Sequence, residues 1–217
     1  MATSDSESCN ECSEDILSDE EKEEEQEYEK NQGEIVDPRV KKTIEEMLEA
    51  RGYTLTQEVQ EEEVKSLVGS KVGYPDLHVL FATDYAGGEE VKFNVKIVTA
   101  YLTYIRKKNL KHVIIIHQGK APSARVNESI KQYIIAKNIK IETFPQCTLK
   151  YNPTKHRLVP KHEAMSKEEG KNFKGKYGDK FNKIKTTDPI VRFYGFEKGD
   201  VVVVYRKDGT VNYRIVI

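Results

Sequence analysis

Apolar residues in the first part of the chain recur at two different spacings. Asp37 and Pro38 supply a cap and a first-turn proline, and Gly52 supplies a stop, so we expect a helix between them. Further helices are expected from Thr99 to about Lys108 and from Ser123 onward. The apolar positions that support the first and third helices are Val40, Ile44, Met47 and Leu48, and Val126, Ile130, Tyr133 and Ile134.

Strand-like patterns alternate with these helices. Alternation of apolar and polar residues, or a short apolar run, predicts strands at 77–83, 91–98, 112–117 and 139–144. The sequence Tyr-Ala-Gly-Gly at 85–88 is typical of the turn that joins the first two strands. Strands that alternate with helices predict a layered α/β domain over residues 37–145.

The pattern changes after Pro145. Ser166 and Glu169 have the spacing of a capping box, which predicts a basic helix to about Tyr177. Two apolar runs around Asp208 and Gly209 predict a closing hairpin with a primed turn. We therefore expect a second, small α+β domain over residues 146–217.

The charge of the chain is divided unevenly. Through Glu34 the sequence has 14 Asp and Glu residues against two Lys, which leaves 33 Lys and Arg against 22 Asp and Glu, a net charge of +11, for the remainder. A segment this poor in apolar residues cannot offset the entropy of ordering, so residues 1–36 are predicted to be a disordered acidic tail. The basic remainder suits a protein that works near nucleic acid or on an acidic partner.

Apolar runs and cysteines narrow the class of protein. No apolar run approaches the roughly 20 residues that span a bilayer, and the start of the sequence lacks the pattern of a secretion signal, so we expect no membrane association. The chain has three cysteines, a small and odd number that indicates a reducing compartment.

Asp76, Glu90 and Lys92 form the pattern that most favours an enzyme. An acidic residue on one strand and Glu-x-Lys on its neighbour can hold a divalent cation while the lysine positions water, as in restriction-type nucleases. Lys92, Asn94 and Lys96 would equally form the polar face of an ordinary amphipathic strand. We favour the strand face and keep a metal-dependent nuclease as the alternative.

Other candidate clusters point to ordinary structural roles. Cys9 and Cys12 have metal-ligand spacing but no second ligand pair nearby, so we interpret them as free thiols. His156 and His162 lack a suitably spaced Cys, Ser or Asp, so we expect hydrogen-bonding or surface histidines. The lysine-rich stretch 167–185 either faces a phosphate backbone or an acidic protein, or is simply solvated.

Four stretches near the carboxyl end identify a family resemblance. They are HRLVPKH at 156–162, DPIVRFYG at 188–195, KGDVV at 198–202 and YRIV at 213–216. In this order they resemble the fifth subunit of eukaryotic DNA-directed RNA polymerases, whose carboxy-terminal part corresponds to a smaller archaeal polymerase protein that lacks the first domain. Shorter similarities at 51–53, 56–58, 122–124 and 141–144 extend the resemblance over about residues 37–217, the eukaryotic two-domain form.

The resemblance implies a non-catalytic structural subunit that requires no cofactor or metal. In such proteins the amino-terminal domain, which resembles a nuclease fold without a known catalytic role, forms part of a jaw near downstream double-stranded DNA. The carboxy-terminal domain anchors to the largest subunit, among other polymerase subunits, and the final hairpin is expected to offer an edge and a polar face to a partner strand. The implied partner-binding residues are His156, Leu158, Val159, Pro160, Lys161, His162, Asp188, Pro189, Arg192, Tyr194, Gly195, Gly199, Tyr213 and Arg214.

Three features depart from the family pattern. Residues 181–184 read FNKI where the family usually has Leu-Pro-x-Ile, the turn at 207–210 is shorter than usual, and the acidic tail is atypical. These departures suggest a divergent homologue, such as one encoded by a large DNA virus with its own polymerase. The expected location is therefore the nucleus for a cellular protein, or the host cytoplasm and virion for a viral one.

Overall fold

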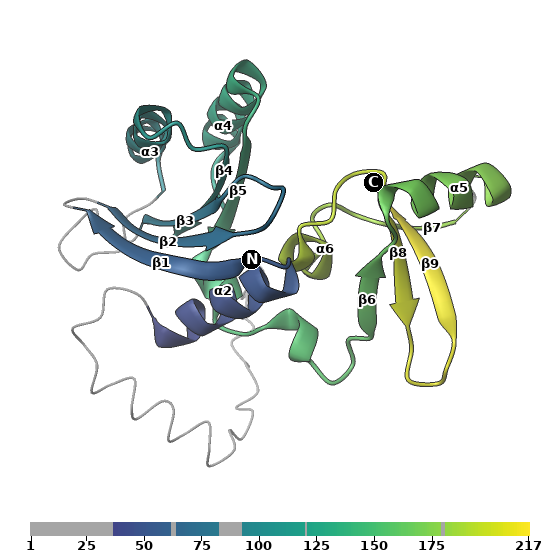
Figure 1. The fold of residues 1–217 in the computed structure, drawn as a ribbon. Helices are drawn as coiled ribbons and strands as arrows, with labels where there is room; N and C mark the ends of the chain where they lie inside the picture. The colour runs from purple at the N-terminus through teal and green to yellow at the C-terminus, as the bar shows by residue number, and fades with distance from the viewer. Residues whose placement is uncertain (1–36, 62–63, 83–92, 120, 179–180) are drawn as a thin grey trace, which may run out of the picture. The chain divides into compact units, whose positions relative to one another are not determined.

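The computed structural model describes residues 37–61, 64–82, 93–119, 121–178 and 181–217 (Figure 1). The predictions about the acidic tail, its two cysteines and the turn at 85–88 fall outside these residues. Residues Ile35–Ile217 form one compact unit. Among the described residues no helix combines the length and hydropathy needed to cross a membrane.

The first part of this unit is a five-stranded sheet in the order β1-β2-β3-β4-β5. β2 runs antiparallel to both β1 and β3, whereas β3, β4 and β5 are parallel to one another. The strands and the helices of this part are α2 (Pro38–Ala50), β1 (Thr54–Glu61), β2 (Val64–Ser70), β3 (Leu77–Ala82), α3 (Val95–Lys107), β4 (His112–His117), α4 (Ala124–Lys137) and β5 (Lys140–Pro145).

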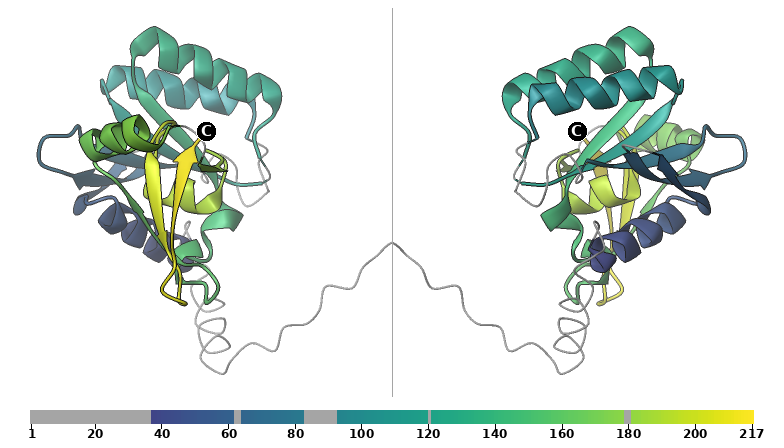
Figure 2. Two further views of the ribbon diagram at one scale, coloured as in Figure 1. Left: turned by 90° about the vertical axis from the view of Figure 1, so that its right-hand side faces the viewer. Right: turned by 90° about the vertical axis from the view of Figure 1, so that its left-hand side faces the viewer.

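Helices cover both faces of this sheet, which confirms the layered α/β architecture (Figures 1 and 2). Alternate residues of the central strand point to opposite faces, so Val113 and Ile115 pack toward α3 and α4. Ile114 and Ile116 pack toward α2 on the other face. Because β3 and β4 are buried on both faces, their sequences read as continuous apolar runs.

One predicted strand is a helix. A strand was expected at 91–98, but the chain is helical from Val95, where the Asn94 side chain accepts a hydrogen bond of 3.1 Å from the Ile97 N–H. The buried side chains of α3 continue at helical spacing through Ile105. The cap and this longer pattern outweigh the local alternation, and the helix starts before the predicted Thr99.

The hairpin formed by β1 and β2 was not predicted. Its strands pair antiparallel between Thr54 and Ser70, and β2 also pairs with β3. β1 alternates weakly and is largely exposed, so its sequence carries little hydrophobic signal. Its position at the edge of the sheet explains that composition.

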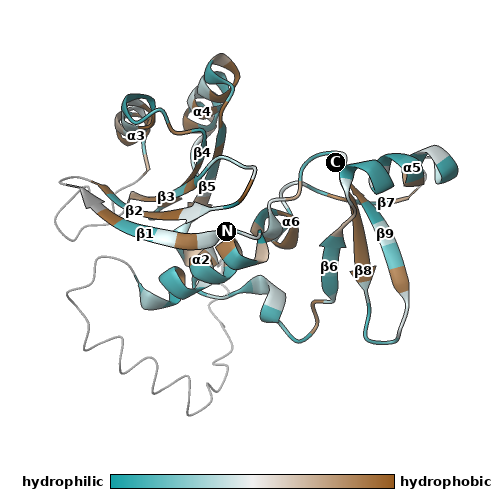
Figure 3. Ribbon diagram, viewed as in Figure 1, coloured by the Kyte–Doolittle hydropathy of each residue, from teal (hydrophilic) through white to brown (hydrophobic). Residues whose placement is uncertain are grey.

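The second part of the unit is a four-stranded sheet in the order β6-β8-β9-β7, which agrees with an α+β arrangement. Its apolar residues lie mainly on β8, whereas β6 and α5 are hydrophilic (Figure 3). The elements of this part are η1 (Gln146–Leu149), η2 (Pro153–Lys155), β6 (Lys161–Ala164), α5 (Lys167–Tyr177), β7 (Asn182–Ile184), α6 (Pro189–Tyr194), β8 (Val201–Tyr205) and β9 (Val211–Val216).

The capping box and the closing hairpin were predicted, but the turn type was wrong. Ser166 and Glu169 form the reciprocal bonds of the box at the start of α5. At the hairpin only Gly209 has a positive φ, of 82°, and its N–H bonds the Arg206 carbonyl at 3.1 Å. This is a three-residue loop with glycine in the left-handed position, because Asp208 keeps a negative φ.

The hairpin also does not offer the free edge that was expected of it. β8 pairs with β6, and β9 pairs with β7, so both hairpin strands lie inside the sheet. The edge strands of this sheet are β6 and β7. The expected polar face is also only partial, since Asn212 and Arg214 share their side of the hairpin with the buried valines Val202, Val204 and Val216.

Candidate partner-binding groove

The short helix α6 is defined by its two ends. The Asp188 side chain accepts a hydrogen bond of 2.9 Å from the Ile190 N–H, and Pro189 occupies the first turn. Gly195 ends the helix in the left-handed region with φ 69°. A side chain at Gly195 would also meet the Arg51 guanidinium, because an added Cβ lies 2.9 Å from Arg51 Cζ.

Arg51 connects α6 to the first sheet. Its side chain is 4% exposed and forms a two-pronged pair with Glu142, with both N–O distances at 2.9 Å. The same guanidinium donates to the Phe193 carbonyl at 2.9 Å and to the Arg192 carbonyl at 2.6 Å. Arg51 therefore donates to two carbonyls in the last turn of α6, while its charge is neutralised by Glu142 on β5.

Glu142 is the acidic centre of this buried network. Its carboxylate also lies 3.3 Å from His112 Nε2, and His112 Nδ1 lies 3.3 Å from the Tyr53 hydroxyl. Burial alone would raise the pKa of Glu142, but the His112 hydrogen bond and the charge and hydrogen bonds of Arg51 outweigh it and lower the pKa to about 2.

This lowered pKa predicts an acid-sensitive fold. The Glu142 carboxyl has an ordinary pKa of 4.5 and a pKa of about 2 in the folded chain, so its contribution is present above pH 4.5 and is lost as the pH falls toward 2. We expect chemical denaturation to show a steeper loss of stability over this interval in the wild type than in Glu142→Gln. Parallel pH profiles would contradict the assignment.

Arg192 points to the first sheet as well. Its guanidinium carbon lies 4.2 Å from the centre of the Phe144 ring, and its side chain donates to the Thr143 carbonyl. Burial lowers the pKa of Arg192, and the Glu142 carboxylate opposes that change. Among the described residues, the Arg192 side chain therefore contacts β5 of the first sheet.

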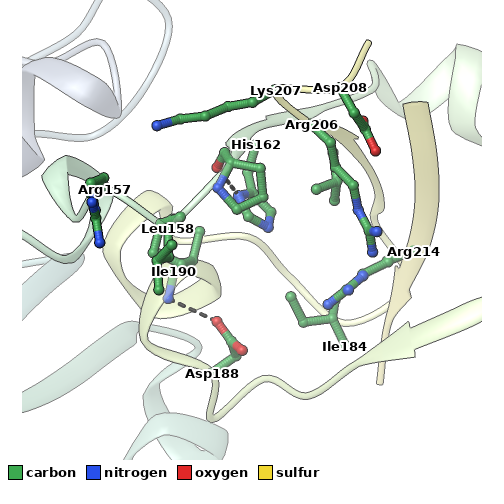
Figure 4. Close-up of a pocket in the computed structure, with 13 residues that line it drawn as sticks. Arg157, Leu158, His162, Ile184, Asp188, Ile190, Arg206, Lys207, Asp208 and Arg214 are labelled. Carbon is green, nitrogen blue, oxygen red and sulfur yellow. Dashed lines mark hydrogen bonds between the residues drawn. The ribbon is translucent and has the colours of Figure 1, made fainter. Parts of the chain in front are cut away.

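A groove of about 880 Å³ opens on the second sheet, beside α6 (Figure 4). Side chains from the segment before β6, the start of α6 and the closing hairpin surround it. The residues that line it are Arg157, Leu158, Val159, Pro160, His162, Ile184, Asp188, Ile190, Val204, Arg206, Lys207, Asp208 and Arg214.

The lining combines an apolar wall with unpaired positive charge. Leu158 is 75% exposed, a large value for a leucine, and Ile190 and Val204 form a buried floor. None of the four cations Arg157, Arg206, Lys207 and Arg214 forms an ion pair with a described residue. This composition is typical of a binding surface for a partner with complementary charge.

His162 serves the shape of the groove. Its Nδ1 lies 2.7 Å from the Pro160 carbonyl, and the residue is 7% exposed. Burial lowers its pKa, and the nearby Arg214 charge lowers it further, although the Pro160 hydrogen bond opposes this. The expectation of a hydrogen-bonding histidine agrees with this geometry, which favours the neutral ring.

The groove gathers six of the predicted partner-binding residues. These are Leu158, Val159, Pro160, His162, Asp188 and Arg214. The other eight do not line the groove. His156 accepts a hydrogen bond from the Leu158 N–H, Lys161 pairs with Glu163, the Gly199 carbonyl accepts from Lys174, and Tyr213 contacts Phe173. On α6, Pro189 begins the helix, Arg192 donates to the Thr143 carbonyl, Tyr194 stacks on Phe196, and Gly195 lies against Arg51.

Sequence reasoning omitted several lining residues from the predicted partner-binding set. Ile190 lies inside a recognised motif, and its burial follows from the helical spacing of α6. Arg206 precedes the hairpin turn and Lys207 lies in it. Because this turn departs from the family pattern, the resemblance assigned no role to these two charges. The Val204 side chain could have been assigned from the alternation of β8 once the sheet order was known.

The other candidate sites gain no support. Asp76 is exposed in the loop before β3, and Glu90 and Lys92 lie outside the described residues. Within the described ranges no group of three or more His, Cys, Asp or Glu residues could hold a metal ion. In the lysine-rich stretch, Lys167 pairs with Glu197 and Asp200.

Comparisons with known proteins agree with the signature stretches. The family model "RNA polymerase Rpb5, C-terminal domain" matches residues 151–216. The chain is 30% identical to the DNA-directed RNA polymerases I, II, and III subunit RPABC1 of Caenorhabditis briggsae over 203 residues, which covers 82% of this chain and 94% of the relative. It is 30% identical to the subunit of that name from Dictyostelium discoideum over 196 residues, with 82% and 95% covered.

A viral protein shows a shorter similarity. The putative DNA-directed RNA polymerase subunit 454R of Invertebrate iridescent virus 6 is 39% identical over 89 residues, which is 36% of this chain and 48% of the viral protein. The names of these relatives are those of polymerase subunits and give the nuclease alternative no support. The chain belongs to the Rpb5 (RPABC1) family of RNA polymerase subunits.

Proposed function

We propose that this chain is a non-catalytic structural subunit of a multisubunit DNA-dependent RNA polymerase and that the groove docks it on the largest subunit. The observation that carries the proposal is that three separate signature stretches contribute to one groove, through Leu158, Asp188 and Arg214. An exposed leucine beside unpaired cations is suited to binding a protein surface. Association with further polymerase subunits follows from membership of such a complex.

The lining chemistry favours docking over catalysis. His162 is held by the Pro160 carbonyl, and Asp188 is occupied by its capping bond to Ile190. Among the described residues, neither side chain forms a hydrogen bond to a Ser, Thr or Cys side chain that could act as a nucleophile. The chain would then contribute to transcription by holding the complex together.

The first sheet, with its three helices, is proposed as the jaw domain near downstream DNA, with nuclease-like topology but no reaction of its own. It corresponds to residues 37–145, and the second sheet to the assembly domain 146–217. Contacts of the jaw with double-stranded DNA would be weak, salt-dependent and independent of sequence. The chain would be found with its polymerase, in the nucleus of a cell or in the host cytoplasm and virion of a virus.

Co-purification with a charge placed on the exposed leucine tests the docking proposal. Full-length tagged chain is expected to recover the two large polymerase subunits in stoichiometric amounts from its native cells. Leu158→Asp should reduce this recovery at least about tenfold, because it replaces an apolar contact with a carboxylate that loses its hydration when the partner covers it. Its side chain is 75% exposed, so the fold should be unaffected.

Ile135→Asp is the matched control for this experiment. Ile135 is 82% exposed on α4, outside the lining of the groove. The Ile135→Asp chain should therefore recover the large polymerase subunits at the wild-type level. Equal recovery of Leu158→Asp and Ile135→Asp would exclude the groove as the docking surface. Recovery of the wild-type chain without polymerase subunits would exclude the subunit proposal itself.

A further inference from the structure

The strongest unexplained feature of the groove is the side chain of Arg214. Its Nε is buried and has no hydrogen-bond acceptor among the described residues. Buried donors in folded proteins are nearly always paired, because leaving one unpaired sacrifices its hydration without compensation. Arg214 extends into the groove from β9 (Figure 4), so a ligand in the groove could supply the acceptor if this side chain turned toward it.

A second arginine converges on the same place. The side chain of Arg206 points toward the Arg214 guanidinium (Figure 4). Two cations directed at one another repel unless an anion lies between them. Arg206 follows β8 and Arg214 lies on β9, so both side chains reach the groove from the same hairpin.

The acidic residues of the groove are already engaged. The Asp188 carboxylate accepts from the Ile190 N–H, and the Asp208 carboxylate accepts from the Thr210 N–H and hydroxyl. Neither forms an ion pair with Arg206 or Arg214 among the described residues. The arginines thus present positive charge to an external ligand.

The opposite wall of the groove selects for an apolar neighbour. Leu158, Val159 and Pro160 form this wall, and Ile190 lies at its base. Burial of an exposed leucine against another apolar side chain contributes favourably to binding. A ligand that fits both walls must carry negative charge and apolar surface close together.

We propose that the groove binds a segment of the partner protein in which a carboxylate lies beside an apolar side chain. The carboxylate pairs with Arg214 and Arg206, and the apolar side chain covers Leu158 and Ile190. This inference rests on the proposed docking function and specifies the chemistry of the partner. A guanidinium donates two parallel hydrogen bonds to one carboxylate, and Nε of Arg214 would be one of these two donors once the side chain turns toward the ligand.

A nucleic acid fits this groove less well than a protein segment. Among the described residues no Phe, Tyr or Trp lines it on which a base would stack, and the ring of His162 is only 7% exposed. Asp188 and Asp208 would lie close to any run of phosphates and repel it. A single carboxylate can avoid these two groups, whereas a continuous phosphate backbone passes near them.

Nuclear magnetic resonance titration of the full-length chain tests the proposal directly. The probes are acetyl-Leu-Asp-Leu-amide, the matched acetyl-Leu-Asn-Leu-amide and a short DNA duplex. We expect the Asp peptide, at millimolar concentration, to shift the amide resonances of residues 157–160, 206–208 and 214. The Asn peptide should bind about ten- to one-hundredfold more weakly, because the charge-assisted hydrogen bonds are lost.

Two arginine variants locate the effect. Arg214→Lys keeps the charge but removes the Nε donor, and Arg206→Gln removes a charge from an exposed loop with little effect on folding. Each should bring the affinity for the Asp peptide toward that for the Asn peptide. Unchanged preference for the Asp peptide in both variants would overturn the assignment of these residues.

The remaining outcomes are equally decisive. Equal affinity for the two peptides, or no shift at the groove with either, would overturn carboxylate recognition. Duplex DNA that shifts the same resonances and displaces the Asp peptide would overturn the protein ligand in favour of phosphate. Because polymerase recovery by the wild-type chain is measured separately, these failures are distinguishable from failure of the docking proposal.

Discussion

Replacement of Arg51 by methionine is expected to lower the free energy of unfolding by about 3–5 kcal/mol, one of the two largest losses we predict. The variant leaves the Glu142 carboxylate with one partner fewer in a site where Arg51 itself is only 4% exposed. It also removes the donors that reach the Phe193 and Arg192 carbonyls. Methionine keeps much of the aliphatic volume, so the loss reports charge and hydrogen bonding more than packing.

Urea denaturation at neutral pH measures this loss, and Arg125→Met is the matched control. Arg125 is exposed in the first turn of α4, so its replacement should change stability by less than about 0.5 kcal/mol. The double variant with Glu142→Gln should be less destabilised than the sum of the single variants, because the pair is removed together. Strict additivity would mean that the two groups do not stabilise one another.

Local signals in the sequence were sufficient for most elements. The caps at Asp37, Ser123 and Ser166 each begin a helix where predicted, because a cap depends only on residues within one turn. The segment at 95–98 was misassigned because four residues that alternate also fit the start of a helix. β1 was missed because an exposed edge strand has no apolar face to detect.

The contacts that join the two sheets could not be predicted in the same way. Arg51 meets Glu142 and Phe193 across 91 and 142 positions of sequence. Nothing in the residues next to Arg51 indicates these distant partners. Family signatures pointed to Arg192 and Gly195 as partner-binding residues, yet Arg192 donates to the Thr143 carbonyl of β5 and Gly195 lies against Arg51.

The residues that line the groove were only partly predicted from the sequence. Motif positions indicated Leu158 and Arg214, because a resemblance carries information on residues distant in sequence. The charge of Arg206 was not chosen, since it directly precedes the turn at 207–210, where this chain departs from the family. The role of all the predicted residues in partner binding, Leu158 and Arg214 included, stays a prediction.

Phe193→Ala is expected to lower the free energy of unfolding by about 3–5 kcal/mol, because it removes buried apolar contacts and leaves a cavity. Phe193 belongs to α6 in the second part of the chain but is only 2% exposed and packs in the core of the first sheet, with Ile44 and Phe144 among the buried residues of the same cluster. Truncation leaves a cavity between the two parts that neither can easily fill. Tyr177→Ala, at an aromatic residue that is 53% exposed, is the control and should cost much less.

Hydrogen exchange measured by mass spectrometry shows whether this core couples the two parts. If Phe193 stabilises both, amides in α2 and in α6 should lose protection together in Phe193→Ala, because each packs on the same cluster. Faster exchange in α6 with unchanged exchange in α2 would instead mean that residues 37–145 and 146–217 are stable independently. The first result is expected, since Arg51 and Arg192 place further hydrogen bonds across the same boundary.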